Sequence, residues 1–364
     1  MITYKEAGVN IEAGDDFSKY IYEQIKSTWV RDGWDKVVTL FDDFSGLRCI
    51  NISHLDNIVM GVGYDGIGTK VAIAEALGKY YTIAFDLLAM VCDDAVIRGA
   101  EPIFVGSIID LEHIPLDCHI ELKQLVSGYV EAAKYARVQI LNGEVAELGN
   151  RIKGQGKLNL NWGAGVIWFA DRDRLISGKN IEVNDSIVLL REKGFRSNGL
   201  SLVRKIYEKV YGPFNVAQDD ILNKILTPSR IYTPAIVDMT GGVEGDRKVE
   251  ISGMAHITGG GLPSKLGRML KPSGLGAIID DPFDPPEIMS KFQREGDVFS
   301  VEAYNTWNMG NGFAIVTKDP ITVIDIAKEY DIEAKFGGKI IDKKLIQIMD
   351  RGAFSKGKLL SFKI

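Results

Sequence analysis

The sequence is poor in cysteine and has no long apolar run. Its three cysteines, Cys49, Cys92 and Cys118, are odd in number and lack C-x-x-C spacing, which argues against a disulfide framework and a zinc site. No apolar run approaches the ~20 residues that a membrane-spanning helix needs. The N-terminal residues MITYKEAGVN contain an acid and lack the apolar core of a secretory signal. We therefore expect a cytoplasmic protein whose cysteines are buried thiols.

Basic residues are outnumbered by acidic ones, with 43 lysines and arginines against 49 aspartates and glutamates. The formal net charge is −6, which argues against a general nucleic-acid-binding surface. An anionic ligand would therefore need local cations or a metal ion to offset the background field of the protein. We expect a small-molecule ligand, and neither a nucleic acid nor a membrane as partner.

The length of the chain favours two domains, because 364 residues are many for one hydrophobic core. The polar, turn-rich stretch 171–185 is the best linker. We therefore expect one domain over residues 1–170 and a second over residues 171–364. Apolar periodicity in the first half predicts alternating strands and helices, at residues 57–64, 82–98, 102–110 and 117–136.

The stretch GVGYDGIGTK, residues 61–70, contains two incomplete nucleotide-binding motifs. Its glycines follow G-x-G-x-x-G, but Asp65 stands inside the loop, where a bare carboxylate would repel a diphosphate by roughly several kcal/mol. If Asp65 instead ligates Mg²⁺, the repulsion becomes attraction, and Lys70 adds a second cation. Two alternatives remain open. One is a dinucleotide loop with Asp86 as the acid about 20 residues later, and the other is a plain glycine turn capped by Asp65.

Three carboxylates share one side of the apolar helix expected next. Asp86 lies seven residues before Asp93 and eight before Asp94, so a period of 3.6 residues places all three on nearly one face. Buried without partners they would be costly, whereas a divalent cation would stabilise them together. The alternative is a solvated face with Arg98 as partner. A later strand delivers Glu144 beyond a glycine, either as a further metal-reaching carboxylate or as a hairpin acid.

Two glycine-rich loops in the second half precede expected helices. They read FRSNGLSLVRK at 195–205 and MAHITGGGLPSKLGR at 254–268. Small hydrogen-bonding residues before a helix present backbone N–H groups to an anion, and Arg196 adds positive charge. Helix capping by Ser197 or Thr258 is the alternative. His256 could be an acid, a base or a satisfied buried side chain.

The order and spacing of these motifs resemble the phosphoribosylformylglycinamidine cyclo-ligase family, also called aminoimidazole ribonucleotide synthetases, of purine biosynthesis. The matching stretches run nearly from end to end: YKEAGVNIEAG at 4–14, YDGIGTK at 64–70, DLLAMVCDDAVIRGAEP at 86–102, NGEVAE at 142–147, SNGLSLVRK at 197–205, PSRIY at 228–232, AHITGGG at 255–261 and NTWNMGNG at 305–312.

The resemblance implies an α+β fold of two α/β domains. The N-terminal domains of two subunits would contribute strands to an intersubunit β-barrel, and the C-terminal domain would be an α/β sandwich-like domain. The resemblance also implies a homodimer that uses ATP and Mg²⁺. In the family reaction, ATP phosphorylates the formamide oxygen of formylglycinamidine ribonucleotide. The amidine nitrogen then attacks that carbon and phosphate leaves.

The resemblance further implies roles for individual residues. Lys70, Asp94 and His256 would be catalytic. ATP would be bound by Asp65, Gly66, Gly68, Thr69 and Lys70, and the metal ion by Asp65, Asp86, Asp94 and Glu144. The ribonucleotide would be held by Arg196, Ser197, Asn198, Gly199, Thr258, Gly259, Gly260, Gly261 and Asn308.

The chain departs from the family pattern at several positions. The usual GGFGG is DDFSG at 42–46, which puts acids beside an expected phosphate loop. The usual PHSNG is FRSNG, so the fixed charge of Arg196 replaces a titratable group. Asn161 and Asn10 stand where the family has aspartates. One carboxylate fewer can alter metal binding.

Other functions on the same scaffold are alternatives. Selenophosphate synthetase and the hydrogenase maturation protein would need cysteines that the chain lacks at the relevant places, since it ends LLSFKI. Thiamine monophosphate kinase fits the acids but not NTWNMGNG or AHITGGG. A divergent paralogue that binds nucleotide without turnover is an answer of a different class, which the DDFSG and Asn161 departures keep open.

Overall fold

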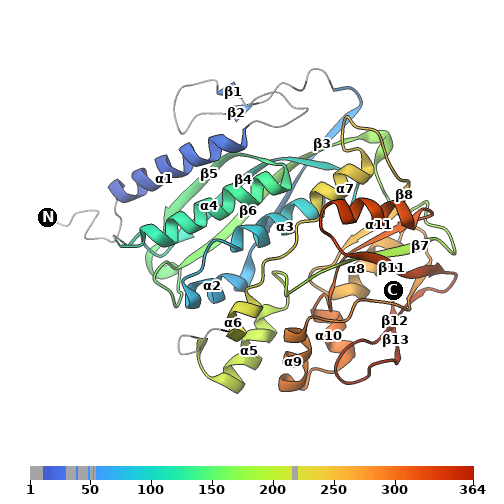
Figure 1. The fold of residues 1–364 in the computed structure, drawn as a ribbon. Helices are drawn as coiled ribbons and strands as arrows, with labels where there is room; N and C mark the ends of the chain where they lie inside the picture. Colours follow the sequence, from blue (N-terminus) through green and yellow to red (C-terminus); the bar gives the residue numbers. More distant parts are fainter. Residues whose placement is uncertain are drawn as a thin grey trace.

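The computed structural model describes residues 11–29, 38–39, 48–49, 52, 55–115, 117–214 and 220–364 (Figure 1). The α-helices are α1 (Ile11–Ile25), α2 (Val71–Leu77), α3 (Ile83–Val96), α4 (His119–Ala136), α5 (Leu200–Tyr211), α6 (Asp220–Ile225), α7 (Thr233–Thr240), α8 (Gly261–Leu270), α9 (Glu287–Gly296), α10 (Ser300–Thr306) and α11 (Pro320–Glu329). The 3₁₀ turns are η1 (Lys26–Thr28), η2 (Gly68–Lys70), η3 (Gly149–Arg151) and η4 (Arg172–Arg174). The strands are β1 (Val38–Thr39), β2 (Arg48–Cys49), β3 (Ile58–Gly66), β4 (Glu101–Leu111), β5 (Gln139–Glu147), β6 (Leu160–Asp171), β7 (Ser186–Arg191), β8 (Ile251–His256), β9 (Gly276–Ile279), β10 (Asn311–Thr317), β11 (Ala334–Ile341), β12 (Leu345–Met349) and β13 (Leu359–Lys363). Among the described helices, none is long and apolar enough to cross a membrane.

The predicted elements of the first half are confirmed as β3, α3, β4 and α4, with boundaries shifted by a few residues. The chain turns away after α3 at Gly99, whose φ of +73° is a conformation that residues with a side chain rarely adopt. Cys92 and Cys118 are buried free thiols, as expected. The DDFSG stretch and Asn10 lie outside the described residues.

A four-stranded sheet in the order β3-β6-β4-β5 forms the first half of the molecule. Neighbouring strands are antiparallel except for β4 and β5, which are parallel. Helices α1, α3 and α4 lie over one face (Figure 1). The inward residues of β6, which include Trp162, Ala164 and Val166, pack into the core beneath these helices.

The opposite face of this sheet has no helix over it in the described part of the chain (Figure 1). Met60, Val62 and Tyr64 alternate along β3 on this face, with exposed fractions of 62%, 47% and 82%, and Ile108 of β4 is 56% exposed. Exposed apolar side chains gathered on one sheet face mark an interaction surface more often than a solvated one. We call these four residues the open-face patch.

A seven-stranded sheet in the order β13-β12-β9-β11-β7-β10-β8 forms the second half. Alternate residues of β7 enter two separate cores. Val188 and Leu190 pack with α7 and α11, whereas Ile187 and Leu189 belong to the core that includes α8. Helices thus cover both faces, which gives the sandwich-like layering expected of the C-terminal domain, and the two mixed sheets confirm an α+β fold.

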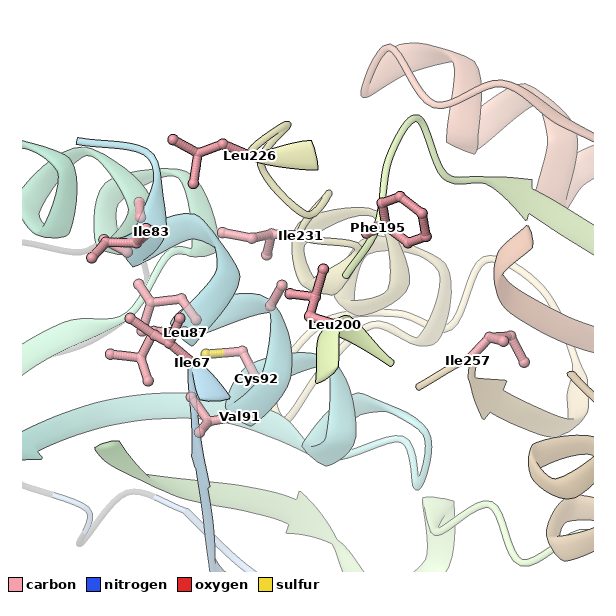
Figure 2. Close-up of a cluster of buried hydrophobic side chains, with 14 of the residues drawn as sticks. Ile67, Ile83, Leu87, Val91, Cys92, Phe195, Leu200, Leu226, Ile231 and Ile257 are labelled. Atoms are coloured by element: carbon pink, nitrogen blue, oxygen red, sulfur yellow. The ribbon is translucent and has the colours of Figure 1, made fainter. Parts of the chain in front are cut away.

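The two halves share one hydrophobic core. Figure 2 shows Ile67, Leu87 and Cys92 of the first half close to Leu200 and Ile231 of the second, and all five are buried. Helix α3 also packs against α7. We keep the domain division at residues 170 and 171 as a proposal, because β6 ends the first sheet and β7 starts the second.

Candidate active site

Lys70 and Asp86 form a buried ion pair. Both side chains are fully buried, and Nζ of Lys70 donates to Oδ1 of Asp86 at 2.7 Å. Nζ also donates to the carbonyl oxygens of Phe195 at 2.9 Å and Thr227 at 2.5 Å, and Ser229 donates to the same carboxylate oxygen through its backbone N–H and its hydroxyl. These contacts use all three ammonium hydrogens. The arrangement does not support the prediction that Lys70 contacts phosphates and Asp86 a metal ion.

Asp93, on the same helix, also has protein partners. Its Oδ1 accepts hydrogen bonds of 2.9 Å from the backbone N–H groups of Tyr232 and Thr233 and from the hydroxyl of Thr233. This carboxylate therefore caps the N-terminus of α7. Burial raises the pKa of Asp93 to about 7, although the charge of Arg196 and the hydrogen bonds oppose that rise. Two of the three helix acids are thus paired with protein cations, which corrects the expectation that one metal ion holds all three.

Arg196 is enclosed where the two halves meet, with an exposed fraction of 2%. Nη1 donates to Oε2 of Glu192 at 2.7 Å and to the carbonyl oxygen of Arg230 at 2.9 Å, and Nη2 donates to Oδ2 of Asp93 at 3.0 Å. The guanidinium group also lies over the ring of Tyr232, 5.4 Å from its centroid. Because both terminal nitrogens face protein groups, the geometry does not support the prediction that Arg196 binds substrate.

His256 lies between Arg196 and Asp94 and is 1% exposed. Its Nδ1 is 2.6 Å from Oδ1 of Asp94, and its Nε2 is 2.6 Å from Nη2 of Arg196. Burial and then the charge of Arg196 lower the pKa of His256 to about 4. The imidazole is therefore neutral at pH 7, with both ring nitrogens in contact with protein groups.

The proton affinity of His256 gives a first prediction. The folded protein should protonate this ring only near pH 4, whereas an ordinary histidine titrates near pH 6.5. Because the unfolded chain binds the proton first, the contribution of His256 to the free energy of unfolding falls as the pH drops from about 6.5 towards 4. The Hε1 resonance of His256, assigned with the His256→Asn variant, should stay fixed between pH 8 and 6. A midpoint near 6.5 would contradict this environment.

Asp94, Asp65 and Lys265 form a group of charged side chains that interact electrostatically, which we call the charged triad. The side chain of Asp94 is 49% exposed. Burial and then the charge of Asp94 raise the pKa of Asp65, although a hydrogen bond from the backbone N–H of Gly66 opposes this. Burial raises the pKa of Asp94, but the hydrogen bond from His256 and the nearby positive charges of Lys265 and Arg196 together outweigh it, and the net shift is downward. Burial lowers the pKa of Lys265, which interacts with both acids. Two carboxylates that repel each other electrostatically are suited to a cation.

Glu144 lies apart from the charged triad. It pairs with Ile108 of β4, whose side chain points to the open face of the sheet, whereas Asp65 pairs with the buried Ala164 on the helix-covered face. The strands that carry Asp65 and Glu144, β3 and β5, are opposite edges of this sheet. Among the described residues, no group of three or more acids, histidines or cysteines could hold a metal ion. One protomer therefore does not bring these predicted metal ligands together.

The predicted nucleotide loop and the two glycine-rich loops do come together. A Cβ atom added at Gly68, whose φ is +66°, would lie 3.4 Å from the carbonyl oxygen of Ser197, and one added at Gly259 would lie 3.5 Å from Nδ2 of Asn198. The side-chain oxygens of Ser197 and Asn198 are buried and have no hydrogen-bond partner among the residues that the structure describes. Polar atoms of this kind are available to a ligand. The loops therefore place the predicted ATP and substrate residues in one region.

The glycines at the starts of α5 and α8 are required by geometry. Gly199 and Gly260 are the N-caps of α5 and α8, with φ of +76° and +87°. A Cβ atom at Gly261 would collide with the carbonyl oxygen of Tyr304, and the N–H of Gly261 donates to the carbonyl oxygen of Thr258 at 2.9 Å. Neither helix has a side-chain cap, so the capping alternative for Ser197 and Thr258 is not supported.

Both the nitrogen and the oxygen of the Asn308 side-chain amide form hydrogen bonds with the protein backbone. Nδ2 donates to the carbonyl oxygen of Gly194 at 3.0 Å, and Oδ1 accepts from the N–H of Gly310 at 2.8 Å. The prediction that Asn308 holds the ribonucleotide is therefore not supported by its contacts. Thr69 lies in η2 between Gly68 and Lys70 and is partly exposed.

Lys265 and Glu192 are two residues of this region that sequence reasoning did not single out. Lys265 follows the glycine loop by one helical turn. A lysine at that distance from a predicted anion-binding loop was the feature of the sequence that could have indicated its place in the site. Glu192 lies four residues before Arg196, a spacing that pairs side chains on a helix. Here the same spacing pairs them across a loop, so no helical pattern could have revealed the pair.

Two family profiles match the chain: AIR synthase related protein, N-terminal domain, over residues 49–165, and AIR synthase related protein, C-terminal domain, over residues 182–351. A Methanocaldococcus jannaschii protein named phosphoribosylformylglycinamidine cyclo-ligase is 34% identical over 354 residues, which cover 94% of this chain and 93% of the relative.

Two solved structures share the fold. Thiamine-monophosphate kinase from Stenotrophomonas maltophilia K279a superposes with a TM-score of 0.63 at 12% identity, covering 92% of this chain and 96% of that chain. PurL from T. maritima complexed with ATP superposes with a TM-score of 0.52 at 15% identity, covering 85% of this chain and 44% of that chain. At these identities the likeness concerns the fold alone.

Proposed function

This chain belongs to the phosphoribosylformylglycinamidine cyclo-ligase family, and from that premise we propose that it closes the imidazole ring of aminoimidazole ribonucleotide. The γ-phosphoryl group of ATP is transferred to the formyl oxygen of formylglycinamidine ribonucleotide, and ADP leaves. The amidine nitrogen then forms a bond to the formyl carbon, while the bond from that carbon to the phosphorylated oxygen breaks and phosphate departs. The reaction is an ATP-dependent C–N ligation in purine biosynthesis, and we place it in the cytoplasm.

The observation that carries this proposal is the meeting of the glycine loops at the starts of α5 and α8, together with the charged triad, in which Lys265 belongs to α8. Helix N-termini bind anions through backbone N–H groups and the helix dipole, so α5 and α8 suit the phosphate of the ribonucleotide. Lys265 offsets charge on the transferred phosphoryl group, and the glycines allow the backbone to approach the ligands. Ser197 and Asn198 supply further polar atoms. Most of the catalytic effect on this view is positioning and charge stabilisation.

The acids of the charged triad fit Mg²⁺, because hard divalent cations prefer carboxylate oxygens. Asp65 carries a raised pKa partly because Asp94 is near, so a cation between them would remove that repulsion. Asp65 and Asp94 would hold the ion, whereas Glu144 points to the open face of the sheet, away from Asp65. Bound Mg²⁺ neutralises charge on the triphosphate of ATP. The solved PurL complexed with ATP supports a nucleotide on this fold.

We further propose a homodimer that buries the open-face patch. Strands β3 and β5 are edges, and edge strands with apolar neighbours tend to pair with another chain. If β3 of one subunit lay beside β5 of the other around a two-fold axis, two four-stranded sheets would close into a barrel. Asp65 and the partner's Glu144 would then lie on adjacent strands. The two side chains would still point to opposite faces of the barrel wall, so strand pairing alone would not bring them to one metal ion.

Charge in the open-face patch should prevent dimer formation. Val62→Asp places a carboxylate on the exposed sheet face, where burial in a dimer would cost several kcal/mol or require protonation (about 2–7 kcal/mol for a polar group). The variant should elute as a folded monomer in size-exclusion chromatography with light scattering, and turnover should fall with dimer content. Val183→Asp is the matched control, because Val183 is 43% exposed and lies outside the patch. A Val62→Asp dimer of wild-type stability would exclude this interface.

The proposed function is tested by measuring ADP and aminoimidazole ribonucleotide together. With ATP, Mg²⁺ and formylglycinamidine ribonucleotide, both products should appear in a 1:1 ratio, and omission of the ribonucleotide should suppress ADP release. Slow ATP hydrolysis that is indifferent to the ribonucleotide would instead indicate a sister phosphotransferase. Nucleotide binding without any phosphate release would indicate a non-catalytic paralogue.

A further inference from the structure

Four basic side chains meet in a groove between α8 and the end of β13, which we call the basic groove. Arg268 lies in the last turn of α8, Lys271 is the C-cap of that helix, Lys344 directly precedes β12, and Lys363 ends β13. The groove has a volume of about 830 Å³. Among the described residues that line it, none is an acid and none belongs to the charged triad. The basic groove is therefore a positively charged surface that the proposed catalytic chemistry does not use.

The four cations lack anionic partners. All four side chains are exposed, and within the described ranges none of them forms an ion pair. Other lysines of the same half do pair, as Lys335 does with Asp281 at 2.9 Å. Like charges held in one groove repel each other, and a bound anion would relieve that repulsion. The dipole of α8 accounts for a cation at Lys271, but Lys344 and Lys363 come from other elements.

A glycine leaves the helix side of the basic groove bare. Gly267 lies inside α8, where glycine is less favourable than alanine, and its φ is not positive. A Cβ atom at this position would lie 3.8 Å from Cδ1 of Ile346 and 3.9 Å from Cγ2 of Ile364, which are ordinary contacts. Neither the backbone nor the packing therefore requires glycine here. Close approach of a ligand to the backbone is a further reason for a glycine, and it fits a residue that lines the groove.

We propose that the basic groove binds a small polyanion that carries a chain of phosphate groups, such as inorganic polyphosphate or the triphosphate of a free nucleotide. Lys363 pairs with Leu345, which directly follows Lys344, so these two lysines lie at the same end of β12 and β13. A Cβ atom at Gly274, in the turn after α8, would lie 3.9 Å from Nζ of Lys344. The cations thus gather at one end of the groove, which suits a compact chain of phosphates bound by arginine and lysine. An extended acidic peptide would spread its charges further, at about 3.3 Å per residue.

Binding is measured by titrating tripolyphosphate into the full chain labelled with ¹⁵N-glycine, in magnesium-free buffer of low ionic strength. The amide resonance of Gly267, assigned by its loss in the Gly267→Ala variant, should shift and saturate. Lys271→Gln combined with Lys344→Gln should weaken this binding about tenfold or more, because two charge-assisted contacts to phosphate are lost. Lys123→Gln combined with Lys209→Gln is the matched control, since it removes the same charge from exposed positions outside the groove. The control should weaken binding by less than about twofold, because distant surface charges are screened.

A steric variant and further probes complete the test. Gly267→Leu puts a side chain into the groove without removing charge, and it should also abolish the saturable shift, read at Gly274. ATP that competes with tripolyphosphate at these amides and binds more tightly would identify a nucleotide as the source, and ATP that binds no more tightly would identify inorganic polyphosphate.

Three results would overturn the proposal. They are a tripolyphosphate titration without saturation at Gly267 or Gly274, equal binding by the two double variants, and binding of a glutamate decapeptide in the absence of tripolyphosphate binding, which would assign the groove to an acidic protein. Ring closure by the Lys271→Gln and Lys344→Gln variant should match the wild-type rate, because neither lysine belongs to the active site. Failure of the proposed function would leave the tripolyphosphate titration unchanged, so the two proposals stand or fall separately.

Discussion

Replacing Asp65 by asparagine should lower the rate of ring closure by about 100-fold or more while leaving folding intact. The substitution removes one charge from the charged triad, where charge on the transferred phosphoryl group must be offset. Folding should tolerate it, because burial and the charge of Asp94 raise the pKa of Asp65. A raised pKa means that this group stabilises the fold at low pH and loses that contribution as the pH rises through its folded-state value. At pH 8 the asparagine variant should therefore melt at or slightly above the wild-type temperature.

Turnover, the dissociation constant of MgATP and the melting temperature together test this prediction. Asp325→Asn is a suitable control, because it removes the same charge from an exposed position on α11. Loss of turnover without loss of stability in Asp65→Asn alone would support its place in the site. An unchanged rate would remove Asp65 from the site, and with it the proposed metal pair.

Replacing Lys70 by methionine should destabilise the protein by about 3–5 kcal/mol, because it leaves the carboxylate of Asp86 buried without its cation. The two carbonyl oxygens of Phe195 and Thr227 lose their donor as well. Urea unfolding followed by circular dichroism measures the loss. Lys79→Met is the control: Lys79 is exposed and its ammonium group donates to Asn223 alone among the described residues, so the change in stability should be less than about 0.5 kcal/mol.

The Lys70 result also decides between two roles for this residue. If Lys70 served to contact phosphates, Lys70→Met would weaken MgATP binding and leave the urea midpoint nearly unchanged. If the buried pair is structural, Asp86→Asn added to Lys70→Met should recover part of the lost stability. The reason is that the neutral amide no longer needs a cation, while its oxygen can still accept from Ser229.

Local pattern predicted the elements of the first half and the burial of its acids. The helix at Ile83–Val96 was foreseen from apolar spacing and a closing glycine, and Asp86 and Asp93 are buried as their neighbours suggested. Such features depend on residues close in sequence, where the 3.6-residue period is informative. The glycine-rich loops were assigned to phosphate-bearing ligands from their residue types, and the family resemblance, which runs nearly the length of the chain, assigned them to one active site.

The partners of the acids could not be predicted, because each partner is distant in the sequence. Asp93 meets Tyr232 and Thr233 across the boundary between the two halves, and Asp86 meets Lys70 from a different segment. A single sequence indicates that buried carboxylates need a positive charge nearby. It does not indicate whether a metal ion, an arginine or a lysine supplies that charge. For Asp86 and Asp93 the choice of a metal ion was therefore not supported.

The buried charges at the junction of the two halves also have a consequence for unfolding. Swinging one half away from the other would separate Lys70 from the Phe195 and Thr227 carbonyls and Asp93 from the first turn of α7, and it would open the apolar contacts of Figure 2 to water. Hinge motion between the two halves is therefore energetically unfavourable. In a scanning calorimeter the chain should melt as one cooperative unit, with a van't Hoff enthalpy that matches the calorimetric enthalpy despite its two sheets.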